Sequence, residues 1–126
     1  MYLVDTNIFL EILLSQDKAQ QCKEILKTYS HHIYVSDFSL HSIGVILFRH
    51  GKEDIFQAFV KDIIFKTKIV TLLRNSYNEL SAIKKKYGLD FDDAYQFTIA
   101  QDNNFILITM DKDFDKVKDI IKVNNI

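Results

Sequence analysis

Short segments that are almost wholly apolar alternate with longer amphipathic segments along this chain, and this alternation restricts the fold more than any other feature. The apolar segments have the length and composition of strands that are buried on both faces of a sheet. They lie at residues 2–4, 33–35, 69–72 and 105–108, and residues 121–123 could add a short fifth strand at the sheet edge. Apolar residues at helical spacing predict helices over residues 7–14, 19–29, 40–47, 52–65 and 75–87, and from residue 92 or 93 to 100.

Strands that alternate with helices indicate a parallel sheet covered by helices on both faces. The sequence therefore predicts an α/β fold, a three-layer α/β/α sandwich in which a mostly parallel sheet has four to five strands. The 126 residues include no proline and only three glycines, so no flexible linker is evident. We expect a single domain that spans residues 1–126.

The composition also bears on where such a chain resides. Its one cysteine, Cys22, cannot form an intramolecular disulfide, which favours a reducing compartment. No apolar run approaches the roughly 18 residues that a membrane span needs, and the N-terminus has no secretory signal pattern. We therefore expect a cytoplasmic protein that does not enter a membrane.

Polar side chains follow the predicted strands at the edge where ligands bind in open α/β sheets. Asp5 follows the first strand, Ser36 and Asp37 follow the second, and Asp111 follows the fourth. Asp92 or Asp93 opens the helix that precedes the fourth strand. Each aspartate alone could simply cap a helix. Several carboxylates at one sheet edge repel one another unless a cation lies between them, and hard oxygen ligands favour Mg²⁺ or Mn²⁺.

Three segments of the chain carry a resemblance to a known family. They are YLVDTN at residues 2–7, GLDFDDA at residues 88–94 and ILITMDKDF at residues 106–114. In their order and spacing they resemble the PIN-domain nucleases, which include the toxin ribonucleases of VapBC toxin–antitoxin modules. The resemblance spans nearly the whole chain and implies the PIN fold.

This resemblance implies metal-assisted hydrolysis of RNA phosphodiester bonds. In it, Asp5, Asp93 and Asp111 match the family's metal ligands and would hold one or two Mg²⁺ or Mn²⁺ ions. Asp92 would then cap the helix beside Asp93. Further groups would orient the carboxylates or bind outside them: Asn7, Thr109 and Asp113.

One position departs from the family. The helix after the second strand has the pattern Ser-x-x-Thr-x-x-Glu in the family, whereas this chain has Ser42 at the glutamate position. A serine hydroxyl is a poor metal ligand, so the site lacks one of four acids. Asp37 and His41 lie four residues apart on one helix face and could compensate. Alternatively, Asp37 caps the helix, and His41 packs or meets solvent.

Charge is distributed unevenly along the chain. The net charge of −1 argues against a generally basic nucleic-acid-binding surface, but residues 49–86 hold nine lysines and arginines against four acidic residues. Three consecutive lysines beside Tyr87 could contact RNA phosphates, with the ring available for stacking: Lys84, Lys85 and Lys86. The alternative is an ordinary solvated helix face.

Two functions therefore remain open from the sequence. The first is a Mg²⁺- or Mn²⁺-dependent endoribonuclease, implied by the resemblance to be the toxin of a toxin–antitoxin pair, with a small antitoxin in an apolar groove. We also expect a homodimer, through exposed Phe or Ile side chains on the first two helices or on residues 52–65. The second function, prompted by Ser42, is a catalytically weakened or inactive PIN-fold protein that binds RNA or a protein partner.

Overall fold

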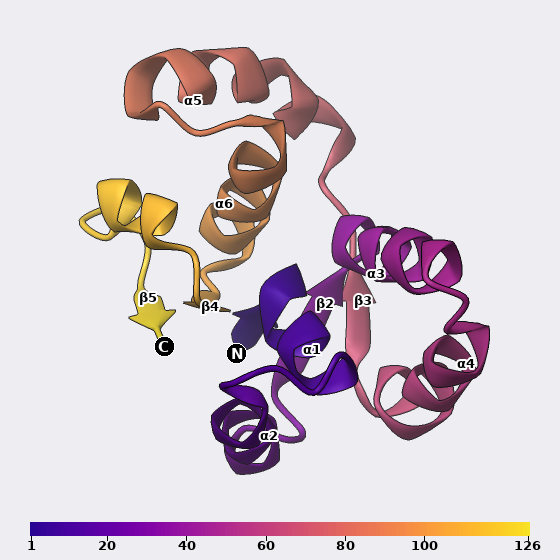
Figure 1. The fold of residues 1–126 in the computed structure, drawn as a ribbon. Helices are drawn as coiled ribbons and strands as arrows, with labels where there is room; N and C mark the ends of the chain where they lie inside the picture. Colours follow the sequence, from indigo (N-terminus) through magenta and orange to yellow (C-terminus); the bar gives the residue numbers. More distant parts are fainter.

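Five parallel strands form one sheet in the order β3-β2-β1-β4-β5 in the computed structural model, which describes all residues from Met1 to Ile126. Figure 1 shows this sheet from β5 at the left to β3 at the right. The strands are β1 (Tyr2–Val4), β2 (Ile33–Ser36), β3 (Lys68–Val70), β4 (Ile106–Thr109) and β5 (Val123–Asn125). Every pairing is parallel, so the predicted α/β class is confirmed.

Six α-helices and three short 3-10 helices connect the strands. The α-helices are α1 (Thr6–Leu13), α2 (Ala19–Thr28), α3 (Asp37–Arg49), α4 (Glu53–Asp62), α5 (Leu80–Tyr87) and α6 (Phe91–Asn103). The 3-10 helices are η1 (Ile64–Lys66), η2 (Arg74–Glu79) and η3 (Lys112–Val117). The helix expected over residues 75–87 thus begins as η2, and the one expected over residues 52–65 ends at Asp62. No helix is both long and apolar enough to cross a bilayer.

Two hydrophobic cores lie on opposite faces of the sheet. Leu3 and Leu107 point into a core with side chains of α5, α6 and η3. Val4 and Ile108, the next residues along, point into a second core with side chains of α1 to α4. Because both faces of the central strands are buried, these strands are apolar without alternation. The predicted three-layer sandwich is confirmed (Figure 1).

The two edge strands lie elsewhere than expected. We predicted a fifth strand at residues 121–123, but Ile121 is buried in the core with α6 and η3. Pairing with β4 therefore begins only at Val123, and Asn124 and Asn125 continue it. At the other edge β3 ends at Val70 rather than at residue 72, because Leu72 turns into the core that α5 and α6 cover.

The start of α6 corrects another prediction. We expected Asp92 or Asp93 to open this helix, with Asp92 as the cap. The helix begins at Phe91, and the N-cap is Asp90, whose side chain accepts a hydrogen bond of 2.9 Å from the Asp93 backbone N–H. Asp92 is exposed in the first turn. An N-cap side chain reaches the N–H three residues ahead, so the cap lies three residues before Asp93.

Candidate metal centre

The strand order places a ligand site between β1 and β4. The chain leaves β1 toward β2 on one side, whereas β4 continues to β5 on the other, so strand order reverses between β1 and β4. Ligands bind at such a reversal, beyond the carboxyl ends of the strands. Asp5 directly follows β1, and Asp111 lies two residues after β4. The edge that the sequence indicated is therefore the edge at which these two carboxylates meet.

A cavity of about 300 Å³ opens at this edge. Both polar and apolar side chains line it, and the uncharged polar ones are Thr6, Asn7, Ser42 and Gln96. We call it the acidic cavity, because five of its lining residues are aspartates: Asp5, Asp90, Asp92, Asp93 and Asp111. No lysine, arginine or histidine lines it. Five carboxylates with no cation in the lining repel one another, and this electrostatic environment favours a positively charged ligand.

Asp5 is the most tightly held of these carboxylates. Its Oδ1 accepts hydrogen bonds from the Thr6 backbone N–H at 2.9 Å and from Gln96 Nε2 at 3.1 Å, and its Oδ2 accepts one from Thr109 Oγ1 at 2.8 Å. Burial raises the pKa of Asp5 more than these hydrogen bonds lower it, and the negative charge of Asp111 adds to the rise. The carboxylate of Asp5 is thus fixed in orientation by hydrogen bonds, but no cationic side chain lines the cavity beside it.

Thr109 joins the ends of the two central strands. Its hydroxyl accepts a hydrogen bond of 2.9 Å from the Asp111 backbone N–H while donating to Asp5. Through these two hydrogen bonds Thr109 can orient both Asp5 and Asp111, which is the role that the family resemblance implies for it. Asn7 also lines the acidic cavity, but it is exposed, and its side chain makes no hydrogen bond to Asp5. The neighbouring Thr6 instead donates to the Ser39 hydroxyl at 2.8 Å.

Asp93 is a second carboxyl group in the acidic cavity whose pKa is raised. Burial, followed by the negative charges of Asp111 and Asp90, raises its pKa from 3.8 to about 7. Oxygen atoms of Asp93, Asp111 and Asp113 all lie within 4.8 Å of one another. Three carboxylate oxygens at this spacing, one of them with a strongly raised pKa, match the hard-oxygen donor set of Mg²⁺ or Mn²⁺. The residues present therefore fit a divalent cation.

Asp113, rather than Asp5, completes the group of carboxylate oxygens that includes Asp93 and Asp111. We expected Asp113 only as a further ligand or a cap, but it belongs to the cluster within 4.8 Å, whereas Asp5 does not. The Lys116 ammonium lies 3.8 Å from the Asp113 carboxylate, and both side chains are about half exposed. This contact lies at the solvent side of the cluster and leaves Asp93 and Asp111 without a cationic partner.

Asp37 and His41 lie apart from the acidic cavity. Both line a separate apolar groove that we call the α3–β3 groove, together with Leu40, Gly44, Val45, Phe48, Phe56 and Ile69. Asp37 accepts a hydrogen bond of 2.8 Å from the Tyr95 hydroxyl and another from its neighbouring backbone N–H. Ser42, on the same helix, does line the acidic cavity. Ser42 thus lies at the acidic cavity, whereas Asp37 and His41, which could have compensated for the missing glutamate, line the α3–β3 groove.

Gln96 is a residue of the acidic cavity that was not predicted from the sequence. This side chain is 1% exposed and lines the acidic cavity, one helical turn after Asp93. A signal was present, because a lone amide stood among apolar residues of a helix whose first turn carries the acids. A buried amide must be hydrogen-bonded, and the nearest partners at that end of the fold are acids and hydroxyls.

The three lysines of α5 are exposed and do not line the acidic cavity. Lys86 Nζ lies 5.3 Å from the centre of the Tyr87 ring, within range of a cation–π interaction. Lys86 and Tyr87 line a separate shallow hollow between α5 and α6. The lysines are therefore exposed at a surface separate from the acidic cavity.

No curated protein gives a significant match. Among solved structures, the chain is similar to VapBC2 from Rickettsia felis bound to a promoter DNA fragment, with a TM-score of 0.80, 18% identity, and coverage of 98% of this chain and 97% of that one. It is also similar to a toxin–antitoxin complex from Klebsiella pneumoniae, with a TM-score of 0.73, 22% identity and coverage of 90% of both chains.

A third similar structure is the toxin VapC20 from Mycobacterium tuberculosis, with a TM-score of 0.72, 13% identity, and coverage of 85% of this chain and 87% of that one. At these identities the likeness concerns the fold. The family model described as PIN domain matches residues 2–120, which is nearly the whole sequence. The chain belongs to the PIN domain family.

Proposed function

We propose that this protein is a divalent-cation-dependent endoribonuclease and the toxin of a toxin–antitoxin pair. The observation that carries the proposal is the acidic cavity at the strand-order reversal, where burial and then the negative charges of neighbouring carboxylates raise the pKa of Asp93 to about 7. The similar structures support the class of activity: one is described as a toxin that cleaves the sarcin–ricin loop, and another as a toxin–antitoxin complex. PIN domains are generally nucleases.

In this proposal Asp5, Asp93 and Asp111 hold the cation, with Asp113 beside them. A divalent cation here supplies neutralising charge for the phosphate and makes a water molecule a better nucleophile. The chain's own groups fix the acids in place: Thr109 and Gln96 hold Asp5, and the Asp90 cap fixes the turn that carries Asp93. Groups fixed before the substrate arrives need no reorganisation during the reaction.

The test is cleavage of a mixed set of single-stranded and structured RNAs by the purified protein. We expect cutting with Mn²⁺ or Mg²⁺ and none with EDTA. Cutting that persists in EDTA would contradict the cation dependence. If no RNA is cut under any condition, while the protein still binds the cation, the second function gains support: a PIN-fold protein that binds RNA or a protein without cleaving it.

That second function rests on Ser42, which lines the acidic cavity at the family's glutamate position. We expect Ser42→Glu to increase Mn²⁺ affinity about 10-fold, since one added carboxylate contact at about 1.4 kcal/mol corresponds to that factor. Calorimetric titration measures this affinity, and the cleavage assay shows whether activity rises with it. The matched control is Ser81→Glu on the exposed surface of α5. Activity that appears only in the Ser42→Glu variant would identify the natural protein as an inactive one.

The lysines of α5 provide a separate prediction. Changing Lys84, Lys85 and Lys86 to glutamine should weaken RNA binding and lower the slope of log affinity against log salt by about 2, because each lost phosphate contact contributes about 0.7. Filter binding at several salt concentrations measures this slope. An unchanged slope would mean that these lysines form only a solvated helix face. Lys61→Gln on α4 is a control for the loss of a single charge.

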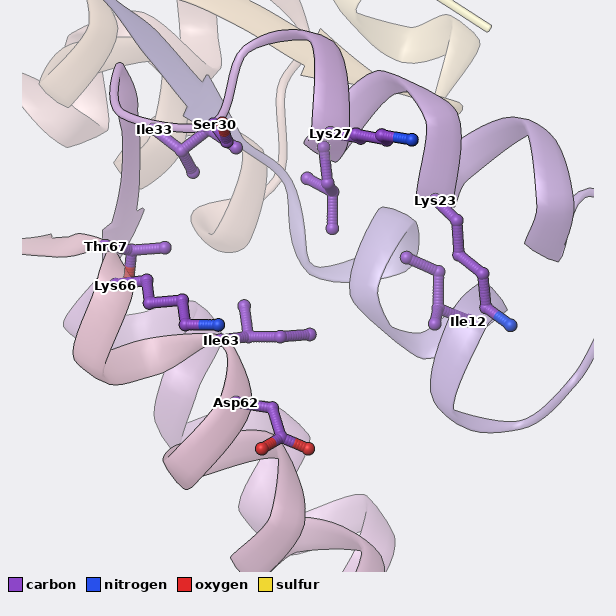
Figure 2. Close-up of a pocket in the computed structure, with 10 residues that line it drawn as sticks. Ile12, Lys23, Lys27, Ser30, Ile33, Asp62, Ile63, Lys66 and Thr67 are labelled. Carbon is purple, nitrogen blue, oxygen red and sulfur yellow. The ribbon is translucent and has the colours of Figure 1, made fainter.

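A second cavity suits the proposed antitoxin. Its volume is about 320 Å³, and it lies between α1 and α2 on one side and α4 with η1 on the other. Figure 2 shows Ile12 and Ile63 on its opposite walls, with Lys23 and Lys27 projecting from α2 and Lys66 from η1. Asp62 is the only acidic residue that lines it. We propose that an antitoxin segment with apolar and acidic side chains occupies this space.

Reversing two of these charges tests the antitoxin proposal. With Lys27→Glu and Lys66→Glu together, the affinity for a co-encoded small protein should fall about 10-fold, because each exposed charge pair contributes up to about 1 kcal/mol. Calorimetry with the purified partner measures the change. The control is the pair Lys84→Glu and Lys85→Glu on α5, which should leave this affinity unaltered. An equal loss in both double variants would mean that net charge rather than this cavity controls binding.

The exposed apolar side chains that a homodimer could use are unevenly distributed over the surface. Among the large apolar side chains that are exposed, only Phe65 lies within the first two helices or residues 52–65. The others include Phe48 and Ile69, which line the α3–β3 groove, and Leu73 just beyond β3. The apolar residues of α1 and α2 instead pack into the hydrophobic core between these helices and the sheet. A homodimer face is therefore better sought on α3 and β3.

A further inference from the structure

Gln96 joins three elements at the acidic cavity through a single amide. Its Nε2 donates to Asp5 Oδ1 at 3.1 Å, at the end of β1, and to the Ser39 hydroxyl at 2.9 Å, on α3. Gln96 itself stands on α6, three residues after Asp93, so both side chains face the same cavity. We infer that Gln96 takes over part of the role of the missing fourth carboxylate, by positioning Asp5 and by offering its own oxygen to the cation.

The hydrogen-bond partners fix which end of the amide faces Asp5. Both hydrogens of Nε2 have an acceptor. Turning the amide over would set Oε1 about where Nε2 now lies, against the Asp5 carboxylate, so that two acceptors faced each other without a proton between them. The orientation with Nε2 toward Asp5 is therefore the one that the surrounding groups require.

This orientation leaves the Gln96 oxygen without a partner. Oε1 is the single buried side-chain nitrogen or oxygen atom in the protein that has no hydrogen bond. Buried polar atoms are nearly always paired, so an unpaired one calls for a partner that is absent from the protein itself. Mg²⁺ and Mn²⁺ bind carbonyl oxygens as ligands, either directly or through a water molecule. Gln96 lines the same cavity as the five carboxylates, so its unpaired oxygen lies on a residue of that site.

The position of Ser42 explains why such a neutral donor matters here. Ser42 lines the acidic cavity but brings no charge to it, so α3 contributes no carboxylate to the site. Gln96 reaches toward the same helix from α6 through Ser39, which is fully buried. The inference rests on the proposed cation-dependent function, and it assigns to α6 two contributions to the site, Asp93 and Gln96.

The test compares Gln96→Leu and Gln96→Glu with wild type and with a matched control, Gln101→Leu, which changes an exposed glutamine of the same helix. The readouts are Mn²⁺ affinity by calorimetry and the rise in the thermal midpoint when Mn²⁺ is added. We expect Gln96→Leu to bind Mn²⁺ about 10- to 100-fold more weakly, the usual loss when a group that orients a metal ligand is removed. Gln101→Leu should bind as wild type does.

Gln96→Glu separates positioning from packing. A carboxylate at this position repels Asp5, so without a cation the midpoint should fall below that of wild type; with Mn²⁺ the rise should exceed that of wild type. If Gln96 only packs α6, both variants lose the same stability with and without Mn²⁺ and keep the wild-type affinity, which overturns the inference. If wild type itself binds neither Mn²⁺ nor Mg²⁺, the proposed function fails as well.

Discussion

Asp93→Asn is expected to lower RNA cleavage about 10³-fold, and Asp5→Asn to do the same. Each substitution removes a negative charge and an oxygen ligand from the acidic cavity while keeping the shape of the side chain. Stabilisation of transition-state charge by a bound cation is worth several kcal/mol, and a loss of about 4 kcal/mol corresponds to this factor. Initial rates of cleavage at saturating Mn²⁺ measure the effect.

The control for this prediction is Asp119→Asn, an exposed aspartate that does not line the acidic cavity. It makes the same change in net charge and should cut RNA at the wild-type rate. Activity that survives in both Asp5→Asn and Asp93→Asn would show that the cleavage comes from another site or from a contaminating nuclease. Loss in the control as well would point to net charge.

Asp93→Asn should also stabilise the cation-free protein at alkaline pH. The pKa of Asp93 is about 7 in the folded chain against an ordinary value of 3.8. Between these values the folded state binds more protons than the unfolded state, so stability falls as pH rises from about 4 to about 7 and then levels off. We expect a loss of about 2 kcal/mol, half of the full linkage energy, because solvent at the cavity mouth screens the charges.

Urea unfolding in EDTA at pH 5 and pH 8 measures this effect. The free energy of unfolding of wild type should be lower at pH 8, and most of the difference should vanish in Asp93→Asn. Adding Mg²⁺ or Mn²⁺ at pH 8 should restore stability to wild type much more than to the variant. A variant that is less stable than wild type at pH 8 would contradict the prediction, since it would mean that the ionised carboxylate stabilises the fold.

The main part of the fold could be predicted because its signal is local. The central strands are buried on both faces, so residues 2–4 and 105–108 had to be apolar throughout, and that pattern is visible without the structure. The edge strands are less constrained. Whether Ile121 pairs with β4 or enters the core depends on η3 and α6, and no local pattern records that choice.

The candidate site was predictable to a similar degree. Strand ends and the family resemblance led to Asp5, Asp93 and Asp111, and the structure brings all three to one cavity. The sequence did not show which residues on α3 face that cavity. Asp37 and His41 differ from Ser42 by only a few positions, yet they face the α3–β3 groove, because a helix turns about 100° with each residue. Gln96 was missed because its partners are distant in sequence.

Asp5 has little freedom to move, and this bears on how such a protein can be controlled. Its backbone N–H donates to the Ile108 carbonyl at 2.9 Å, while its side chain is held by Thr6, Gln96 and Thr109. Displacing the backbone of Asp5 would break its hydrogen bond to β4, and turning its side chain away would break three further hydrogen bonds. We therefore expect an inhibitor of this protein to obstruct access to the acidic cavity, because moving Asp5 out of it would break all of these hydrogen bonds.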